Sequence, residues 1–118
     1  MKHELMFWEG YINMNIEPVE DRCPVEFAVN MIGGKWKLLI INRLILHSTI
    51  RFNELQKMLD PITHRTLTRQ LRELEEAGLI NRVTHPVVPP KVEYSLTEKG
   101  QSLTSILFQL GDWGSKHM

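Results

Sequence analysis

The spacing of apolar residues changes several times along the chain, and each change marks an expected element of secondary structure. Apolar positions that recur every three to four residues indicate amphipathic helices, whereas alternation indicates strands. By this criterion helices are predicted at residues 24–32, 35–46, 53–59, 64–77 and 98–118. Residues 79–85 and 91–96 are predicted to be strands, and residues 50–52 a short extended link. The chain is therefore expected to be mainly helical, with one strand pair near its C-terminal end.

Residues that start or stop helices stand at the ends of these segments. Pro24 suits the first position of a helix, and Gly33-Gly34 follows that helix directly. Side chains able to cap a helix N-terminus precede three others, namely Asn53, Thr63 and Thr97. Five residues of the second helix are predicted to face the core: Trp36, Leu39, Ile40, Leu44 and Ile45.

Three prolines within residues 86–90 separate the two strands, so this segment is predicted to be a stiff loop. Two helices joined by a tight turn, followed by a hairpin with a stiff tip, make a winged helix-turn-helix. We therefore predict an α+β fold, mainly α with a small β-hairpin. Three parts are expected: an N-terminal arm or helix at 1–21, the DNA-binding winged helix-turn-helix at 22–97, and a C-terminal dimerisation helix at 98–118. The aromatic residues of the arm are expected to pack either on the domain itself or in a dimer contact.

Composition excludes several classes of protein. The chain has 118 residues, of which 42% are hydrophobic and 24% charged, as is usual for one small globular domain. No apolar run approaches the ~20 residues of a membrane helix, and no signal peptide is visible, so a cytoplasmic location is expected. Cys23 is the one cysteine, which excludes an intrachain disulfide and a cysteine zinc cluster.

The net charge is zero, but the charge is unevenly distributed. Residues 35–72 hold eight Lys or Arg and two Asp or Glu, a surplus of +6, whereas residues 1–22 carry −3. A basic block inside a neutral chain is typical of a site for a polyanion. The alternative is an ordinary solvated face.

The helix at 64–77 has the most informative pattern. Its inward line is predicted to be Leu67, Leu71 and Leu74. Its other face is predicted to bind DNA through His64, Arg65, Thr66, Thr68, Arg69 and Arg72. The second helix of a helix-turn-helix enters the major groove, where arginine can bond guanine O6 and N7 with two hydrogen bonds. The alternative is an amphipathic surface helix with solvated arginines.

Other cations are candidate phosphate contacts. Lys35 and Lys37 stand where a helix begins, and Arg51 belongs to the same basic block. Lys91, with Arg82 and His85, is suited to phosphate or the minor groove near the hairpin tip. The alternative for the tip is a plain hairpin whose prolines block edge pairing.

Two further features concern regulation and assembly. Cys23 stands beside Arg22 and before Pro24 at a helix start, which favours a thiolate and an oxidant or electrophile sensor. The alternative is a small packing residue. The last helix has an apolar stripe that is predicted to form a dimer interface: Leu103, Ile106, Leu107, Leu110 and Trp113.

Enzyme activity is not expected. The five histidines show no metal-ligand spacing, and phosphate-loop and nucleophile-elbow motifs are absent from the sequence. No cofactor and no metal are predicted.

With these motifs in place, the chain resembles the HxlR family of winged-helix transcription regulators, which are related to the MarR group. The matching stretches lie in order at 23–26, 32–36, 51–55, 67–75, 78–80 and 88–97, within a resemblance that covers about residues 22–114. The resemblance implies a bacterial homodimer that binds an inverted-repeat operator in double-stranded DNA. It also implies, for some members, sensing of a small oxidant or electrophile at the cysteine that matches Cys23. The alternative function is a winged-helix module for protein association without specific DNA binding.

Overall fold

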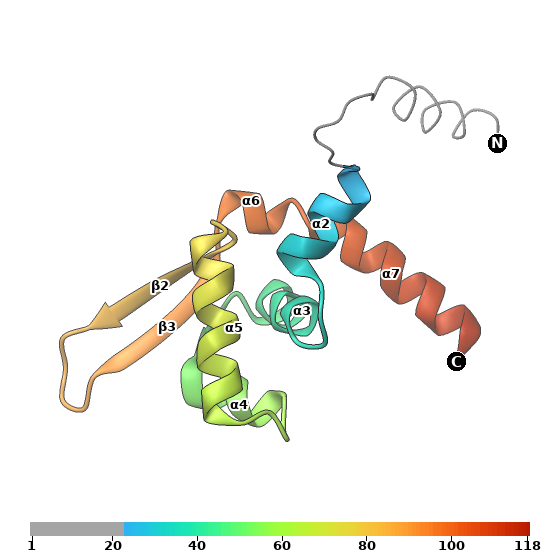
Figure 1. The fold of residues 1–118 in the computed structure, drawn as a ribbon. Coiled ribbons are helices and arrows are strands. Elements are labelled where there is room, and N and C mark those ends of the chain that lie inside the picture. The colour runs from blue at the N-terminus through green and yellow to red at the C-terminus, as the bar shows by residue number, and fades with distance from the viewer. Residues whose placement is uncertain (1–22) are drawn as a thin grey trace, which may run out of the picture. The chain divides into compact units, whose positions relative to one another are not determined.

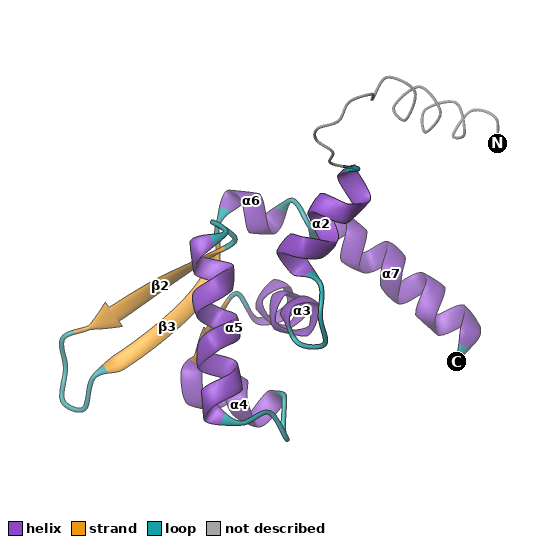
Figure 2. Cartoon of the chain, viewed as in Figure 1, coloured by secondary structure: helices purple, strands orange, loops and turns teal. Residues whose placement is uncertain are grey.

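The computed structural model describes residues 23–118, so the predicted arm at 1–21 lies outside the described residues. The described elements are, in chain order, α2 (Pro24–Ile32), α3 (Lys37–His47), β1 (Thr49–Arg51), α4 (Phe52–Met58), α5 (His64–Glu76), β2 (Ile80–His85), β3 (Lys91–Leu96), α6 (Glu98–Gln101) and α7 (Thr104–His117). The fold is mainly helical with a small antiparallel sheet, as predicted (Figure 2).

The described residues divide into two compact units at Met31. The first contributes α2, which starts at Pro24 as predicted and buries none of its residues. The second unit, residues 32–118, carries the helix-turn-helix and the sheet. Within it, α5 lies beside the hairpin, and α7 runs out to the C-terminus (Figure 1).

The sheet has three strands in the order β1-β3-β2, because the extended link predicted at 50–52 pairs with the hairpin. Its centre is β3, with Ile50 of β1 opposite Tyr94 on one side and Arg82 of β2 opposite Tyr94 on the other. The hairpin β2–β3 with its connecting residues 86–90 is called the wing below. The wing is thus anchored at its base by a third strand.

The core of the second unit lies between α3, α5 and the sheet. The predicted leucine line of α5 is confirmed: Leu67, Leu71 and Leu74 are buried. The prediction for α3 is partly wrong, because Leu39 is 43% exposed while Ile41 is fully buried beside Ile40 and Leu44. In α3 the buried residues share one side of the helix, because Leu44 follows the adjacent Ile40 and Ile41 by about one turn.

Two predicted helix ends are also wrong. The helix predicted at 53–59 begins at Phe52, and its first turn is closed by the Arg51 N–H donating to Glu54 Oε1 at 3.2 Å, so Asn53 is not the cap. The helix predicted at 98–118 is two helices, α6 and α7. Between them Ser102 and Thr104 donate their hydroxyls to the carbonyls of Lys99 and Gln101, a local bonding that competes with a continuous helix.

Thr97 joins three elements where the wing ends. Its Oγ1 accepts from the Gly100 N–H at 3.0 Å, which caps α6 as predicted, and donates to the Gly78 carbonyl at 2.6 Å. Gly100 lies against Leu79 so closely that a Cβ atom would stand 2.2 Å from the Leu79 carbonyl oxygen. These contacts fix the C-terminal end of α5 against the base of the wing.

Candidate nucleic-acid interface

The helix α5 is built to present one face to solvent. Thr63 caps it as predicted, because its Oγ1 accepts from the Thr66 N–H at 3.1 Å. The buried leucine line fixes the rotation of the helix, so the residues between the leucines must face outward. Gly78, at φ +77°, ends the segment in the left-handed conformation that glycine adopts readily.

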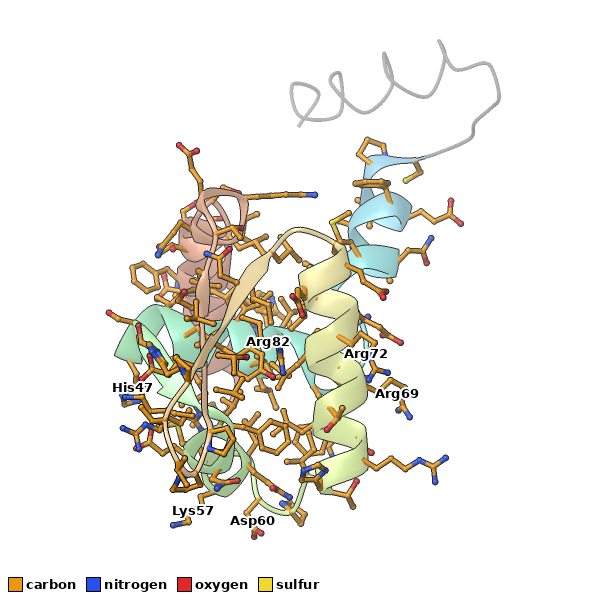
Figure 3. The ribbon with its side chains drawn as sticks, turned by 90° about the vertical axis from the view of Figure 1, so that its left-hand side faces the viewer. His47, Lys57, Asp60, Arg69, Arg72 and Arg82 are labelled. Carbon is orange, nitrogen blue, oxygen red and sulfur yellow. The ribbon has the colours of Figure 1, made fainter. Side chains whose placement is uncertain are left out.

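The outer face of α5 carries the arginines that the pattern predicts. Arg65, Arg69 and Arg72 are exposed and lie three to four residues apart, which places them along one stripe of the helix. Arg69 and Arg72 point away from the body of the protein in Figure 3. Among the described residues, the ion pairs do not include any of these three arginines. Their guanidinium groups are therefore available to a ligand.

The polar residues near the start of α5 are arranged less simply. His64 is exposed, and its ring lies 4.7 Å from that of Phe52. Thr66 and Thr68 are half-buried, and the Thr68 hydroxyl donates to the His64 carbonyl at 2.8 Å. The hydroxyl hydrogen of Thr68 is thus engaged within the helix, which leaves its methyl group and oxygen lone pairs for another partner.

An open groove of about 480 Å³ separates α5 from the wing. His64, Thr68 and Arg72 line it from the helix, and Arg82 lines it from β2 (Figure 3). Glu75 also lines it, one turn beyond Arg72. The groove therefore combines two arginines, Arg72 of α5 and Arg82 of β2, with the carboxylate of Glu75 toward the end of α5.

The structure does not support the predicted role of Lys37 as a phosphate contact. Its Nζ lies 2.7 Å from Glu73 Oε1 of α5, and its side chain is only 12% exposed. The hydrogen bond and charge of Lys37 lower the pKa of Glu73, with a smaller contribution from Arg69. Sequence analysis missed this pair because α3 and α5 come together only in the fold. Lys37 thus forms an ion pair that links α3 to α5.

Lys35 precedes α3 instead of lying in its first turn. Its side chain is exposed, and its Nζ lies 4.7 Å from the centre of the Trp36 ring. This is a cation–π contact on the surface. A role in phosphate binding remains a prediction for Lys35.

The cations predicted at the wing share a carboxylate that sequence analysis did not single out. Glu93 lies 2.8 Å from His85, 3.7 Å from Lys91 and 3.9 Å from Arg51. The hydrogen bond with His85, followed by the charges of Lys91, His85 and Arg51, lowers the pKa of Glu93. Lys91 and Arg51 are therefore partly neutralised rather than free.

Cys23 is half-buried at the start of α2, with its carbonyl accepting from the Phe27 N–H at 3.0 Å. The predicted stripe of the last helix is only partly buried in one chain. Leu107 is buried and Leu103 half-buried, whereas Ile106, Leu110 and Trp113 are 52%, 48% and 63% exposed. Phe108, 62% exposed, adds to this apolar surface.

Within residues 23–118, His, Cys, Asp and Glu side chains do not gather in a group that could hold a metal ion. The helices in this part of the chain are all too short or too polar to cross a membrane.

Known proteins resemble this chain in sequence and in fold. Residues 31–118 match the family model described as HxlR-like helix-turn-helix. An uncharacterized HTH-type transcriptional regulator of Methanothermobacter thermautotrophicus is 49% identical over 110 residues, which cover 93% of this chain and 83% of that protein.

Two solved structures of regulators have a similar fold. The redox regulator HypR in its oxidized form is 48% identical, with a TM-score of 0.76 over 81% of this chain and 98% of that one. The reduced form of the transcriptional regulator YodB from B. subtilis is 32% identical, with a TM-score of 0.70 over 82% and 95%. The chain therefore belongs to the HxlR-like helix-turn-helix family of transcriptional regulators.

Proposed function

We propose that this regulator binds duplex DNA by placing α5 in the major groove and the wing beside it. One observation carries the proposal: α5 buries its leucine line and directs Arg65, Arg69 and Arg72 outward. A helix fits the major groove, and arginine is the residue that most often reads guanine there. The acidic end of α5 marks the limit of this surface, because Glu75 and Glu76 would repel phosphate.

The contacts divide into two kinds. Arg65 and Arg69, near the start of α5, are assigned to base edges, because N-terminal residues of a recognition helix reach deepest into the groove. Arg72 and Arg82 are assigned mainly to the phosphate backbone, which fixes position but carries no base sequence, and Lys91, which lies beside Glu93, to a weaker backbone contact. His64, Thr66 and Thr68 supplement the base contacts through ring, hydroxyl oxygen and methyl groups, and Lys35 supplements the phosphate contacts.

We infer that the regulator acts as a homodimer on an inverted repeat. Ile106, Phe108, Leu110 and Trp113 expose apolar surface on α7, and such a surface is stabilised when a second copy covers it. A two-fold dimer would separate two α5 helices by about one turn of DNA, ~34 Å, or a multiple of it. The parts at 1–21 and 98–118 would then serve dimerisation and 22–97 DNA binding.

We also propose that Cys23 makes DNA binding responsive to oxidants or electrophiles. Support comes from the likeness to the redox regulator HypR, from the likeness to YodB, which is known in a reduced form, and from the position of the thiol at the start of α2. Since the chain has a single cysteine, any disulfide must join two subunits or a small thiol. Either product changes the N-terminal part of the dimer, and a rotation of one subunit would move its α5 out of register with the operator.

The test begins with selection of bound duplexes from random DNA. Arg65→Ala and Arg69→Ala are then compared on the selected operator and on unrelated DNA; each should cost about 1–3 kcal/mol on the operator if it reads a base. Lys116→Ala, which removes an exposed cation near the end of α7, is the control and should bind as wild type does. Operator binding that is unchanged in both arginine variants would refute the groove assignment.

Salt dependence separates this proposal from a protein-association module. Neutralised phosphates make affinity fall steeply as salt is raised, because condensed counterions are released on binding. A chain that selects no sequence, or whose DNA affinity does not change with salt, would instead support the association module.

A further inference from the structure

His85 and Lys91 of the wing and Arg51 of the neighbouring strand β1 are organised around one carboxylate. The two oxygens of Glu93 are used separately: Oε1 contacts His85 Nε2 at 2.8 Å, while Oε2 lies 3.7 Å from Lys91 Nζ and 3.9 Å from Arg51 Nε. These residues come from all three strands: Arg51 belongs to β1, His85 to β2, and Lys91 and Glu93 to β3. Glu93 is therefore the common partner in a cluster that spans the sheet.

The register of the sheet explains why these side chains meet. Arg51 lies directly opposite Glu93 across one strand pair, and His85 lies opposite Lys91 across the other. Alternate residues of a strand point to opposite faces, so Lys91 and Glu93 share one face while Tyr94 belongs to the other. Since Tyr94 lines the groove beside α5, the Glu93 cluster occupies the opposite face of the wing.

Exposure within the cluster has a gradient. The Arg51 side chain is 55% exposed, those of His85 and Lys91 are 37% and 32%, and that of Glu93 is 25%. A ligand from solvent would meet the cations first and the carboxylate last. The two permanent positive charges of Arg51 and Lys91 stand against the one negative charge of Glu93, so the cluster attracts anions weakly.

We propose that Glu93 is a positioning residue that limits the phosphate contacts of the wing by holding Arg51 and Lys91 as partners. This inference rests on the proposed DNA binding. It concerns Arg51 and Lys91, the two cations on the far face of the wing, which would contact the DNA backbone fully only without Glu93. Free of Glu93, each cation can neutralise a phosphate and release a counterion. Glu93 thereby keeps sequence-independent affinity low and leaves discrimination to α5.

The experiment compares Glu93→Gln with Glu98→Gln in full-length protein. Both variants remove one negative charge, but Glu98 is an exposed residue of α6 outside the cluster. Glutamine keeps the shape of Glu93 and can still hydrogen-bond His85. Binding to an unrelated duplex is measured from low to moderate salt, and the slope of log affinity against log salt is the readout. Urea unfolding checks that each variant is folded.

The expected result is a slope for Glu93→Gln that is steeper by about 0.9 to 1.8 than for wild type or Glu98→Gln, since one or two further phosphates are neutralised. Adding Lys91→Ala should reverse about half of the change. Lys91→Ala alone should shift the wild-type slope by much less than ~0.9. This last measurement decides the question even where Glu93→Gln fails to fold.

A slope for folded Glu93→Gln equal to that of Glu98→Gln, or shallower than wild type, would overturn the inference. So would a full loss of ~0.9 in slope for Lys91→Ala in the wild-type background, because the lysine would then be free already. Either result leaves the proposed function standing as long as wild type binds DNA in a salt-dependent manner. Absence of such binding by wild type would refute the proposed function itself.

Discussion

The ion pair between Lys37 and Glu73 allows a sharp test of how α5 is held in place. Two substitutions break the pair and leave different charges behind. Glu73→Ala leaves the Lys37 ammonium, whose side chain is 12% exposed, without its carboxylate. Lys37→Met leaves the Glu73 carboxylate, whose side chain is 44% exposed and which water can solvate, and it keeps an apolar stem at the helix interface.

The two costs should therefore differ. Removing one partner of a fully buried pair costs about 3–5 kcal/mol, whereas exposed pairs contribute about 0–1 kcal/mol. For this intermediate pair we expect Glu73→Ala to lower the free energy of unfolding by about 2 kcal/mol and Lys37→Met by less than about 1 kcal/mol. Urea unfolding at about pH 7 measures both, and the double variant gives the coupling between them.

The pH dependence gives an independent check with a definite sign. The hydrogen bond from Lys37 lowers the pKa of Glu73 below its ordinary value of 4.5 in the folded state. Stability from the pair is therefore fully present above the unfolded pKa and is lost as pH falls through the lower, folded pKa. The difference between wild type and Glu73→Ala should shrink as the pH falls through this window.

Equal costs for the two variants, or a larger cost for Lys37→Met, would refute the burial argument. Lys37→Met should also leave the salt slope of DNA binding unchanged, since its charge is already paired. A slope reduced by about one would restore the phosphate role that the sequence predicted.

Three other predictions concern packing, assembly and redox response. Gly100→Ala should lower the free energy of unfolding, measured in urea, by about 1–3 kcal/mol, because its Cβ would stand 2.2 Å from the Leu79 carbonyl oxygen. Gly111→Ala, with no neighbour within 4 Å of the added Cβ, should raise it by up to ~1 kcal/mol. In sedimentation at micromolar concentration, wild type should be a dimer and Leu110→Glu a monomer. Wild type that sediments as a monomer would refute the proposed dimer. Diamide should lower operator affinity about tenfold through Cys23 and not in Cys23→Ser; a wild-type affinity that is unchanged would leave Cys23 as a packing residue.

Periodicity in the sequence was sufficient for the framework of the fold. The line Leu67, Leu71 and Leu74 predicted both the helix and its buried face, because a fully buried stripe allows one rotation only. Thr63 and Thr97 were predicted as caps for a similar reason: their side chains need only a neighbouring backbone N–H three residues away. Such local features are encoded within one turn of chain.

The missed features depend on residues that are distant in the sequence. Lys37 was expected to contact phosphate because its partner lies on another helix, and helix packing cannot be read from local spacing. Glu93 was passed over for the same reason, since three strands must pair in register before its cations surround it. The break between α6 and α7 was missed because the hydroxyls of Ser102 and Thr104 compete with a helix that the apolar stripe alone would continue.

These pairings change the meaning of the basic block. Its surplus of +6 at residues 35–72 suggests a broad attraction for polyanions, but Lys37 is tied to Glu73 and Arg51 lies beside Glu93. The arginines of α5 are outside these pairs, as are Lys35, Arg43 and Lys57, and α5 is the helix that we propose to reach base edges. A neutral chain organised in this way should hold unrelated DNA weakly and depend on direct contacts from α5. Under the proposed function, Glu73 and Glu93 therefore support discrimination by reducing the charge that Lys37 and Arg51 offer to any polyanion.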